Sequence, residues 1–292
     1  MSSPTITPRA RTTTDLYVQQ WHIWHQQRLE TLTAPHGYLA PTSITWVSNG
    51  ESKGIEAIPG TWSADGDVLT YTPDPQNISF DHPVLNTDEP VNGPLSFAPT
   101  AFGEQALGYL QYGDILVEIN SQTDLVRQDT HRFWLRVKDP KARSRRDFRG
   151  IDYYPVDRKW RIPATFRRPE TNELDIHDSV VTTVLQSYPV VGFVEFTYGS
   201  TPYSLVVSNV FGHASIFFSD ETTGKETYGI GRVLQLDALT LDSLNAIDFN
   251  YAINYPCAFS TFCTCPIPSK RNHLPFAISA GEKTPAENAQ YL

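Results

Sequence analysis

The chain has 292 residues, a formal net charge of −9 at pH 7, and 40% hydrophobic residues. This length suits one large domain or two ordinary ones, and the apolar content argues against a globally disordered protein. The negative charge argues against a general nucleic-acid binder, because binding phosphates requires a cationic surface.

The sequence shows no sign of membrane insertion or export. No apolar run approaches the ~18 residues of a membrane-spanning helix, and the N-terminal segment lacks the apolar core of a signal peptide. We therefore expect a cytoplasmic protein that does not contact membranes. Three cysteines in a chain of this length do not make a disulfide framework.

The N-terminal region predicts a helix. Residues 1–14 are rich in Ser, Thr, Pro and Arg, and we expect them to form a disordered tail. The run DLYVQQWHIWHQQRLETL follows, with apolar residues close to helical spacing. Asp15 is a candidate N-cap, and Pro35 with Gly37 ends the run. We expect an amphipathic helix over about 15–32, within an N-terminal unit that ends at residue 37.

Short β-rich runs separated by turn residues fill 38–138. SITWVS, DVLTYT, ILVEIN and HRFWLRV favour strands because they are rich in β-branched and aromatic residues. The stretch 73–105 is rich in Pro, Asn and Asp, and we interpret it as long loops. Strands this short with such frequent turns predict a small β-sandwich over 38–138.

The segment KDPKARSRRDFRG (138–150) carries six basic residues in an otherwise acidic protein. Charge runs are usually solvated, so we interpret 139–150 as a basic linker. The alternative is that some of these arginines face an anionic ligand or an acidic surface.

Strand-like runs resume in 151–288, namely WRIPATF, VTTVLQ, VGFVEFTY, YSLVVSNVF, SIFFS and RVLQLD. The turn Gly199–Pro202 and the turn TTGKE each predict a hairpin. We expect a larger antiparallel β sheet or barrel here, so the whole chain is predicted to be mainly β.

The last quarter of the chain carries an ordered pattern of particular residues. Its parts are TYGIGR (227–232), DFNYAINYPCAF (248–259), CPIP (265–268), Asn272 with Leu274, and AGEK (280–283). In order and spacing this pattern resembles a family of uncharacterised bacterial and fungal proteins, known only as a domain of unknown function.

The resemblance implies that 38–138 is similar to a forkhead-associated domain, and it implies no activity. The arrangement that grips phosphothreonine in such domains is not evident here. The chain departs from the family pattern at Tyr255, where proline is usual, and at Cys263 and His273.

Arg232 is the central candidate for a binding residue. Its guanidinium offers five donors in a fixed fork that suits a carboxylate or a phosphate. The alternative is an internal salt bridge to Asp248 or Glu282. Asp248 and Asn250 would share a face in extended structure, where they could orient a ligand or cap a turn.

The remaining candidates have similar alternatives. For Asn254 we favour a role in a turn. Glu282 could act as a general base or anchor Arg232, and Lys283 could meet an anion, unless the two form a strand-end salt bridge. Tyr228 would add stacking or a hydroxyl bond.

The cysteines lie in the last quarter of the chain. Cys257, Cys263 and Cys265 could bind zinc together with His273. No C-x2-C pair exists, however, so we favour a Cys257–Cys265 disulfide or buried thiols.

No phosphate loop, H-E-x-x-H, G-x-S-x-G or Rossmann fingerprint occurs, so we expect no cofactor. Our hypothesis is that a small polar or anionic molecule binds in the C-terminal β domain. The expected ligand-binding residues are Tyr228, Arg232, Asn250, Asn254, Asn272 and Lys283. Asp248 and Glu282 are the candidate catalytic residues for acid/base hydrolysis or isomerisation. The alternative is a non-catalytic structural or interaction protein in which 217–283 is a fold clasp.

Overall fold

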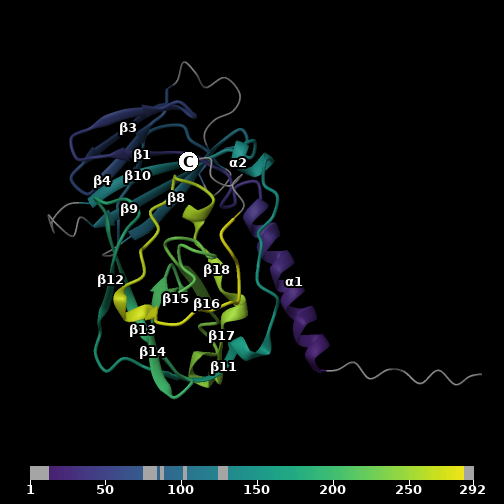
Figure 1. The fold of residues 1–292 in the computed structure, drawn as a ribbon. Helices are drawn as coiled ribbons and strands as arrows, with labels where there is room; N and C mark the ends of the chain where they lie inside the picture. Colours follow the sequence, from purple (N-terminus) through teal and green to yellow (C-terminus); the bar gives the residue numbers. More distant parts are fainter. Residues whose placement is uncertain (1–12, 75–83, 86–88, 101–103, 124–130, 286–292) are drawn as a thin grey trace, which may run out of the picture.

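The computed structural model describes residues 13–74, 84–85, 89–100, 104–123 and 131–285, and it is mainly β, as predicted (Figure 1). The expected N-terminal helix is α1 (Thr13–Thr33). It begins before Asp15, which therefore lies inside the helix rather than at its N-cap. The expected tail lies almost entirely outside the described residues. None of the described helices is both long and apolar enough to span a membrane.

Two sheets form the predicted β-sandwich. The four-stranded sheet contains β2 (Ser52–Ile55), β3 (Ile58–Asp65), β4 (Val68–Thr72) and β7 (Leu95–Phe97), in that order. The six-stranded sheet has the order β1-β10-β9-β8-β5-β6. Its strands are β1 (Pro41–Val47), β5 (Val84–Leu85), β6 (Glu89–Pro90), β8 (Glu104–Tyr112), β9 (Ile115–Thr123) and β10 (His131–Lys138). One core joins both sheets and includes Trp62, Leu69, Leu110, Ile119 and Phe133.

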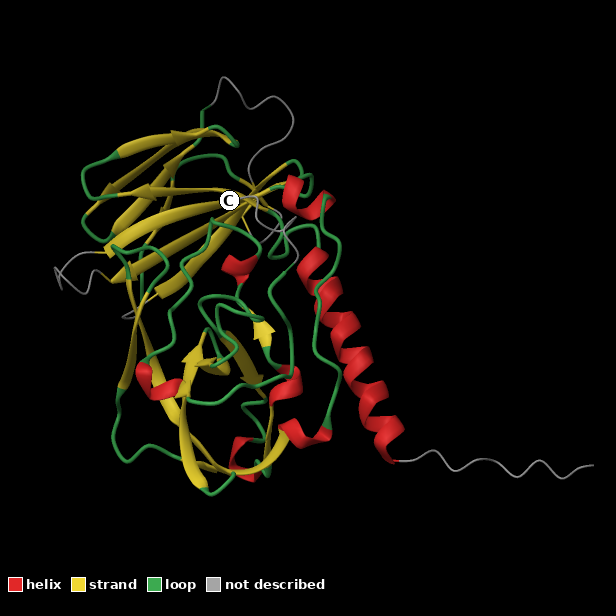
Figure 2. Ribbon diagram, in the orientation of Figure 1, coloured by secondary structure: helices red, strands yellow, loops and turns green. Residues whose placement is uncertain are grey.

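The second half of the chain forms a nine-stranded sheet with the main order β17-β11-β13-β14-β15-β16-β18, in which β12 also pairs with β13 and β19 with β15. Its strands are β11 (Arg161–Arg167), β12 (Leu174–Asp178), β13 (Leu185–Tyr198), β14 (Thr201–Val210), β15 (His213–Asp220), β16 (Arg232–Leu236), β17 (Ala246–Asp248), β18 (Ile253–Asn254) and β19 (His273–Leu274). Both predicted hairpins are confirmed, as the antiparallel pairs β13–β14 and β15–β16. Figure 2 shows this curved sheet beneath the sandwich.

The sequence patterns failed to predict some strands and misplaced the bounds of others. β8 lacks a strong β pattern because Gln105, Ala106 and Gly108 interrupt it, and β12 was not expected. The stretch 73–105 is not all loop, since it contains β5, β6 and β7. The run VTTVLQ is a strand only from Leu185 onward, because the residues before it form a turn closed by a bond from Val184 N–H to Val181 O.

Alternate residues of a strand point to opposite sides of a sheet. In the nine-stranded sheet, apolar residues lie on both sides. One face carries Ile216, Phe218 and Leu234 and forms the main core of this half. The opposite face, which we call the second face, carries Phe217 and Val233 together with the thiols of the last quarter.

Helix α1 runs along the side of the molecule and is tied to the C-terminal segment (Figure 1). Trp21 Nε1 donates to the carbonyl oxygen of Asn250 over 2.7 Å. The basic segment 139–150 is anchored as well, and it contains the short helix α2 (Arg143–Arg146). Arg145 of α2 donates to the carbonyl oxygens of Thr33, the last residue of α1, and of Pro140. The segment is therefore not simply a solvated linker.

Candidate functional site

Arg232 lies inside the protein and does not face a hollow. Its side chain is 0% exposed and forms an ion pair with Asp220, at 2.6 Å between Nη2 and Oδ2. The guanidinium also donates to the carbonyl oxygens of Ile278 and Ala280. The expectation of a ligand-gripping Arg232 is therefore corrected to the internal salt bridge that was its alternative. The partner is Asp220 rather than Asp248 or Glu282.

Asp248 and Asn250 form hydrogen bonds with parts of the chain away from Arg232. Asp248 Oδ2 accepts from the Tyr17 hydroxyl of α1 over 2.6 Å. The Asn250 side chain accepts from the backbone N–H of Asp157 and donates to its carbonyl oxygen, at 3.0 and 2.9 Å. These two residues hold α1 and the segment around Asp157 together, so the expected convergence with Arg232 is absent from this structure.

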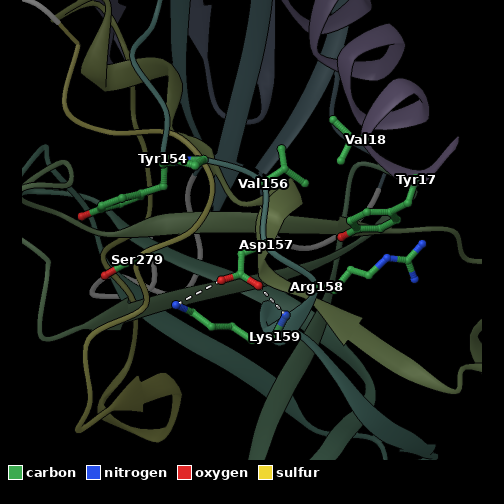
Figure 3. A pocket seen from close by; sticks show the side chains of 9 residues that line it. Tyr17, Val18, Tyr154, Val156, Asp157, Arg158, Lys159 and Ser279 are labelled. Atoms are coloured by element: carbon green, nitrogen blue, oxygen red, sulfur yellow. Dashed lines mark hydrogen bonds and ion pairs between the residues drawn. The ribbon is translucent and has the colours of Figure 1, made fainter. Parts of the chain in front are cut away.

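A surface pocket of about 500 Å3 lies next to these contacts (Figure 3). Tyr17, Arg158 and Ser279 lie in its wall, and Asp157 contacts the Lys159 ammonium over 3.2 Å. Both members of this ion pair are about half exposed, so water and salt weaken the charges that the pocket offers. It is a weak candidate for a site.

Glu282 and Asn254 are also buried and bonded internally. Glu282 accepts from Arg28 Nε over 3.2 Å and from the Asn254 backbone N–H over 2.6 Å. Burial raises the pKa of Glu282 although Arg28 opposes this. Asn254 Nδ2 donates to the Lys283 carbonyl oxygen, while the Lys283 ammonium lies 4.6 Å from the centre of the Tyr154 ring. Glu282 therefore anchors Arg28 of α1 and is enclosed.

Asn272 and Tyr228 complete the set predicted from the sequence. The Asn272 side chain is buried and bonds the N–H and C=O groups of Val206 and the C=O of Phe217. The Tyr228 hydroxyl donates to the Cys257 carbonyl oxygen over 2.9 Å. Each of these polar side chains satisfies backbone groups of the fold.

A cavity of about 250 Å3 lies between the six-stranded sheet and the second face, and we call it the intersheet cavity. The six-stranded sheet contributes Glu104, Glu118, Arg136 and Lys138 to its lining. The other half contributes aromatic and polar side chains, among them Tyr188, Phe217, Tyr255, Cys263, Thr264 and Cys265. Concave pockets with apolar walls and a few converging polar groups are the usual form of small-molecule sites.

One side of the intersheet cavity carries an ion cluster. Glu118 contacts Arg136 Nη1 over 2.5 Å and Lys138 Nζ over 3.5 Å, and all three side chains are largely buried. Burial alone would raise the pKa of Glu118, but the two cations outweigh it and the pKa is lowered. Glu118 is thus ionised at neutral pH, and two positive charges face one negative charge.

Glu104 has the opposite environment. Its carboxyl accepts from Thr264 Oγ1 over 3.3 Å, and the cations of the cluster are bonded to Glu118 instead. Burial raises the pKa of Glu104 to about 7, with Arg136 acting against the shift. Two carboxyls that share a cavity and have pKa values shifted in opposite directions are typical of acid/base sites.

The thiols in the cavity wall, those of Cys263 and Cys265, are buried. All three cysteines are free and buried, and Cys257 N–H donates to Cys265 Sγ over 3.3 Å. The hydrogen bond to Cys265 and burial raise the pKa of Cys263, and burial raises the pKa of Cys265. Thiols of this kind are poor nucleophiles at neutral pH. Of the two favoured states, the structure has the buried thiols and not the Cys257–Cys265 disulfide. No group of three His, Cys, Asp or Glu side chains in the described residues is arranged to hold a metal ion.

Sequence reasoning missed the charged residues of the intersheet cavity. A signal for them existed, because Arg136 and Lys138 are two residues apart in β10 and thus point to one face. Glu118 lies opposite Arg136 in the neighbouring strand. An acidic residue facing two basic ones on one side of a sheet is a detectable pattern once the strand pairing is known.

Residues 146–283 match a family described as "Protein of unknown function (DUF1684)", which confirms the expected resemblance to a domain of unknown function. None of the curated proteins matches the chain. A solved structure, the solution NMR structure of an uncharacterized protein of Haloarcula marismortui, is 29% identical over 49% of this chain and 80% of that one, with a TM-score of 0.40.

Proposed function

We propose that the protein binds a small organic acid in the intersheet cavity, and that Glu104 exchanges a proton with it. The observation that carries this proposal is the pairing of two carboxyls with opposite pKa shifts, Glu104 and Glu118, in one cavity. The reaction class that suits such a pair is acid/base-assisted hydrolysis or isomerisation.

The charges of the cavity support an anionic ligand. When Glu104 is protonated, Arg136 and Lys138 face only Glu118, which leaves one positive charge uncompensated. A carboxylate on the ligand would neutralise it. The volume of about 250 Å3 is slightly below that of a typical drug-sized site, and the aromatic walls suit a compact apolar body.

The experiment is a thermal-shift screen of small monocarboxylates against three proteins. Lys138→Gln removes the cation that we assign to the ligand carboxylate. Lys141→Gln is the matched control, because Lys141 is 76% exposed and pairs with Asp114. A ligand at a hundred times its Kd stabilises a protein by about 2.7 kcal/mol, which is easily measured.

We expect at least one monocarboxylate to raise the Tm of the wild type and of Lys141→Gln but not of Lys138→Gln. Binding should also weaken above about pH 7, where Glu104 loses its proton, and Glu104→Gln should remove this pH dependence. The proposal is wrong if no monocarboxylate stabilises the wild type, or if Lys138→Gln responds as the wild type does.

The motif at 217–283 has a different role in this proposal. Because Arg232, Asn272 and Glu282 are enclosed and bonded internally, we propose that the motif is the fold clasp considered from the sequence. Arg232 directly precedes Val233, whose side chain lines the intersheet cavity. The clasp therefore fixes the strand that forms one wall of the site.

A further inference from the structure

A second hollow, of about 410 Å3, lies between α1 and the strands β16 and β18, and we call it the α1 groove. Helix α1 contributes Trp24, Gln27, Arg28 and Thr31. Residues three or four apart lie on one side of a helix, so one stripe of α1 forms a wall of the groove.

The α1 groove and the intersheet cavity are neighbours over the second face. Val233 and Gln235 of β16 line both hollows. Val233 is paired with Ile253 on one side and with Phe217 on the other, and cross-strand partners point to the same face of a sheet. Ile253 lines the groove and Phe217 lines the cavity. The residues that line both hollows are Tyr38, His213, Val233, Gln235 and Pro256.

The chemistry of the groove differs from that of the cavity. Its side-chain amides belong to Gln27 and Gln235, and Trp24 and Tyr38 add aromatic surfaces. Its guanidinium, Arg28, is bonded to Glu282 and to the Asn254 carbonyl oxygen. Amides both donate and accept hydrogen bonds, so they match hydroxyl groups, which do the same.

We propose that the α1 groove binds a neutral, hydroxyl-rich group, of the size of a sugar ring, joined to the acid in the intersheet cavity. This inference rests on the proposed function, since the acid places the second group in the groove. The ligand is then an acid glycoside, with its carboxylate at Lys138, its ring hydroxyls at the amides and its ring face against Trp24 or Tyr38.

Matched pairs of probes test this proposal by calorimetry. The pairs are 4-hydroxybenzoate, salicylate and glycolate, each with its O-β-D-glucoside. We expect at least one glucoside to bind about tenfold more tightly than its parent acid, as one or two added hydrogen bonds would provide.

Two variants in the groove locate the effect. Gln27→Leu removes an amide from the α1 wall, and Thr31→Trp fills the groove. Both positions are exposed on α1, so the fold should be retained, which circular dichroism and the Tm will verify. Gln26→Leu is the control, because Gln26 is the adjacent exposed glutamine and does not line the groove.

Both groove variants should lose the advantage of the glucoside and keep the affinity of the parent acid, and the control should change neither. The inference is overturned if acids bind but no glucoside binds more tightly, or if the advantage survives in both groove variants. If no acid and no glucoside binds, the proposed function itself fails, and this inference fails with it.

Discussion

Arg232 and Asp220 form an ion pair in which neither side chain is exposed to solvent. The pair joins β16 to the end of β15, and the same guanidinium reaches the carbonyl oxygens at Ile278 and Ala280. It thus connects the last described segment to the sheet. Enclosing two charges is costly, and the ion pair together with the two carbonyl acceptors offsets part of this cost.

We predict that Arg232→Met lowers the free energy of unfolding by about 3–5 kcal/mol, because it leaves the Asp220 carboxylate buried without its cation. Arg232→Lys should also destabilise the protein, since an ammonium cannot reach the acceptors that the forked guanidinium reaches. Urea denaturation measures both changes.

The control is Arg168→Met. Arg168 makes two bonds to Asp242, at 2.9 and 2.7 Å, but both side chains are more than half exposed. Little change in stability is expected, because water replaces the lost contacts. Equal losses at Arg168 and Arg232 would contradict the clasp.

The sequence predicted the elements better than it predicted their contacts. The helix and both hairpins follow from local patterns, such as the turn at Gly199, and these were found. The partner of Arg232 could not be read in this way, because Asp220, Asp248 and Glu282 are equally plausible until the strands are paired.

Local sequence patterns could not predict the intersheet cavity, for the same reason. Glu104 and Thr264 meet across 160 positions of the chain, and the pKa shift of Glu104 depends on burial that only the assembled sheets provide. The polar residues of the last quarter indicated a binding site because so many lie close together in the sequence. In the structure, their side chains form hydrogen bonds with buried backbone groups instead.

Asn272 provides a second test of the clasp. The ladder between β14 and β15 extends only from Val210 and His213 to Ser208 and Ser215, and the Asn272 amide occupies the next position, between Val206 and Phe217. Asn272→Ala leaves three backbone groups unpaired. We predict a loss of about 3 kcal/mol in unfolding free energy.

The matched control for Asn272 is Asn209→Ala. Asn209 is exposed, and its side-chain oxygen accepts a hydrogen bond from the Gly212 N–H. Its replacement should cost about 1 kcal/mol or less, because water can take over the bond. If the two alanine variants unfold at the same urea concentration, Asn272 does not act as a bridge between strands.

Two tyrosines in the wall of the intersheet cavity should respond differently to loss of their hydroxyls. The Tyr255 hydroxyl is buried with no partner among the described residues, whereas the Tyr188 hydroxyl donates to Gln186 Oε1. Tyr255→Phe should leave stability unchanged or raise it by up to about 1 kcal/mol, because an unsatisfied polar group is removed. Tyr188→Phe should lower it by about 1 kcal/mol. Thermal denaturation of both variants measures these changes. A larger loss of stability for Tyr255→Phe than for Tyr188→Phe would show that the Tyr255 hydroxyl has a partner.

Glu104 should make the stability of the protein depend on pH. Its pKa rises from 4.5 to about 7 on folding, so the folded state binds this proton more tightly than the unfolded chain does. Stability from this group is therefore fully present below about pH 4.5 and is lost as the pH rises through 7. At about 1.4 kcal/mol per pKa unit, the loss amounts to about 3 kcal/mol.

Comparison with Glu104→Gln isolates this contribution, since other carboxyls also titrate in the acidic range. Glutamine resembles the protonated carboxyl and cannot ionise. We expect both proteins to be about equally stable at pH 5, and the variant to be more stable by about 2–3 kcal/mol at pH 8. A stability difference that stays the same from pH 5 to pH 8 would mean that Glu104 is ionised throughout this range, and the proton that we assign to the intersheet cavity would not be there.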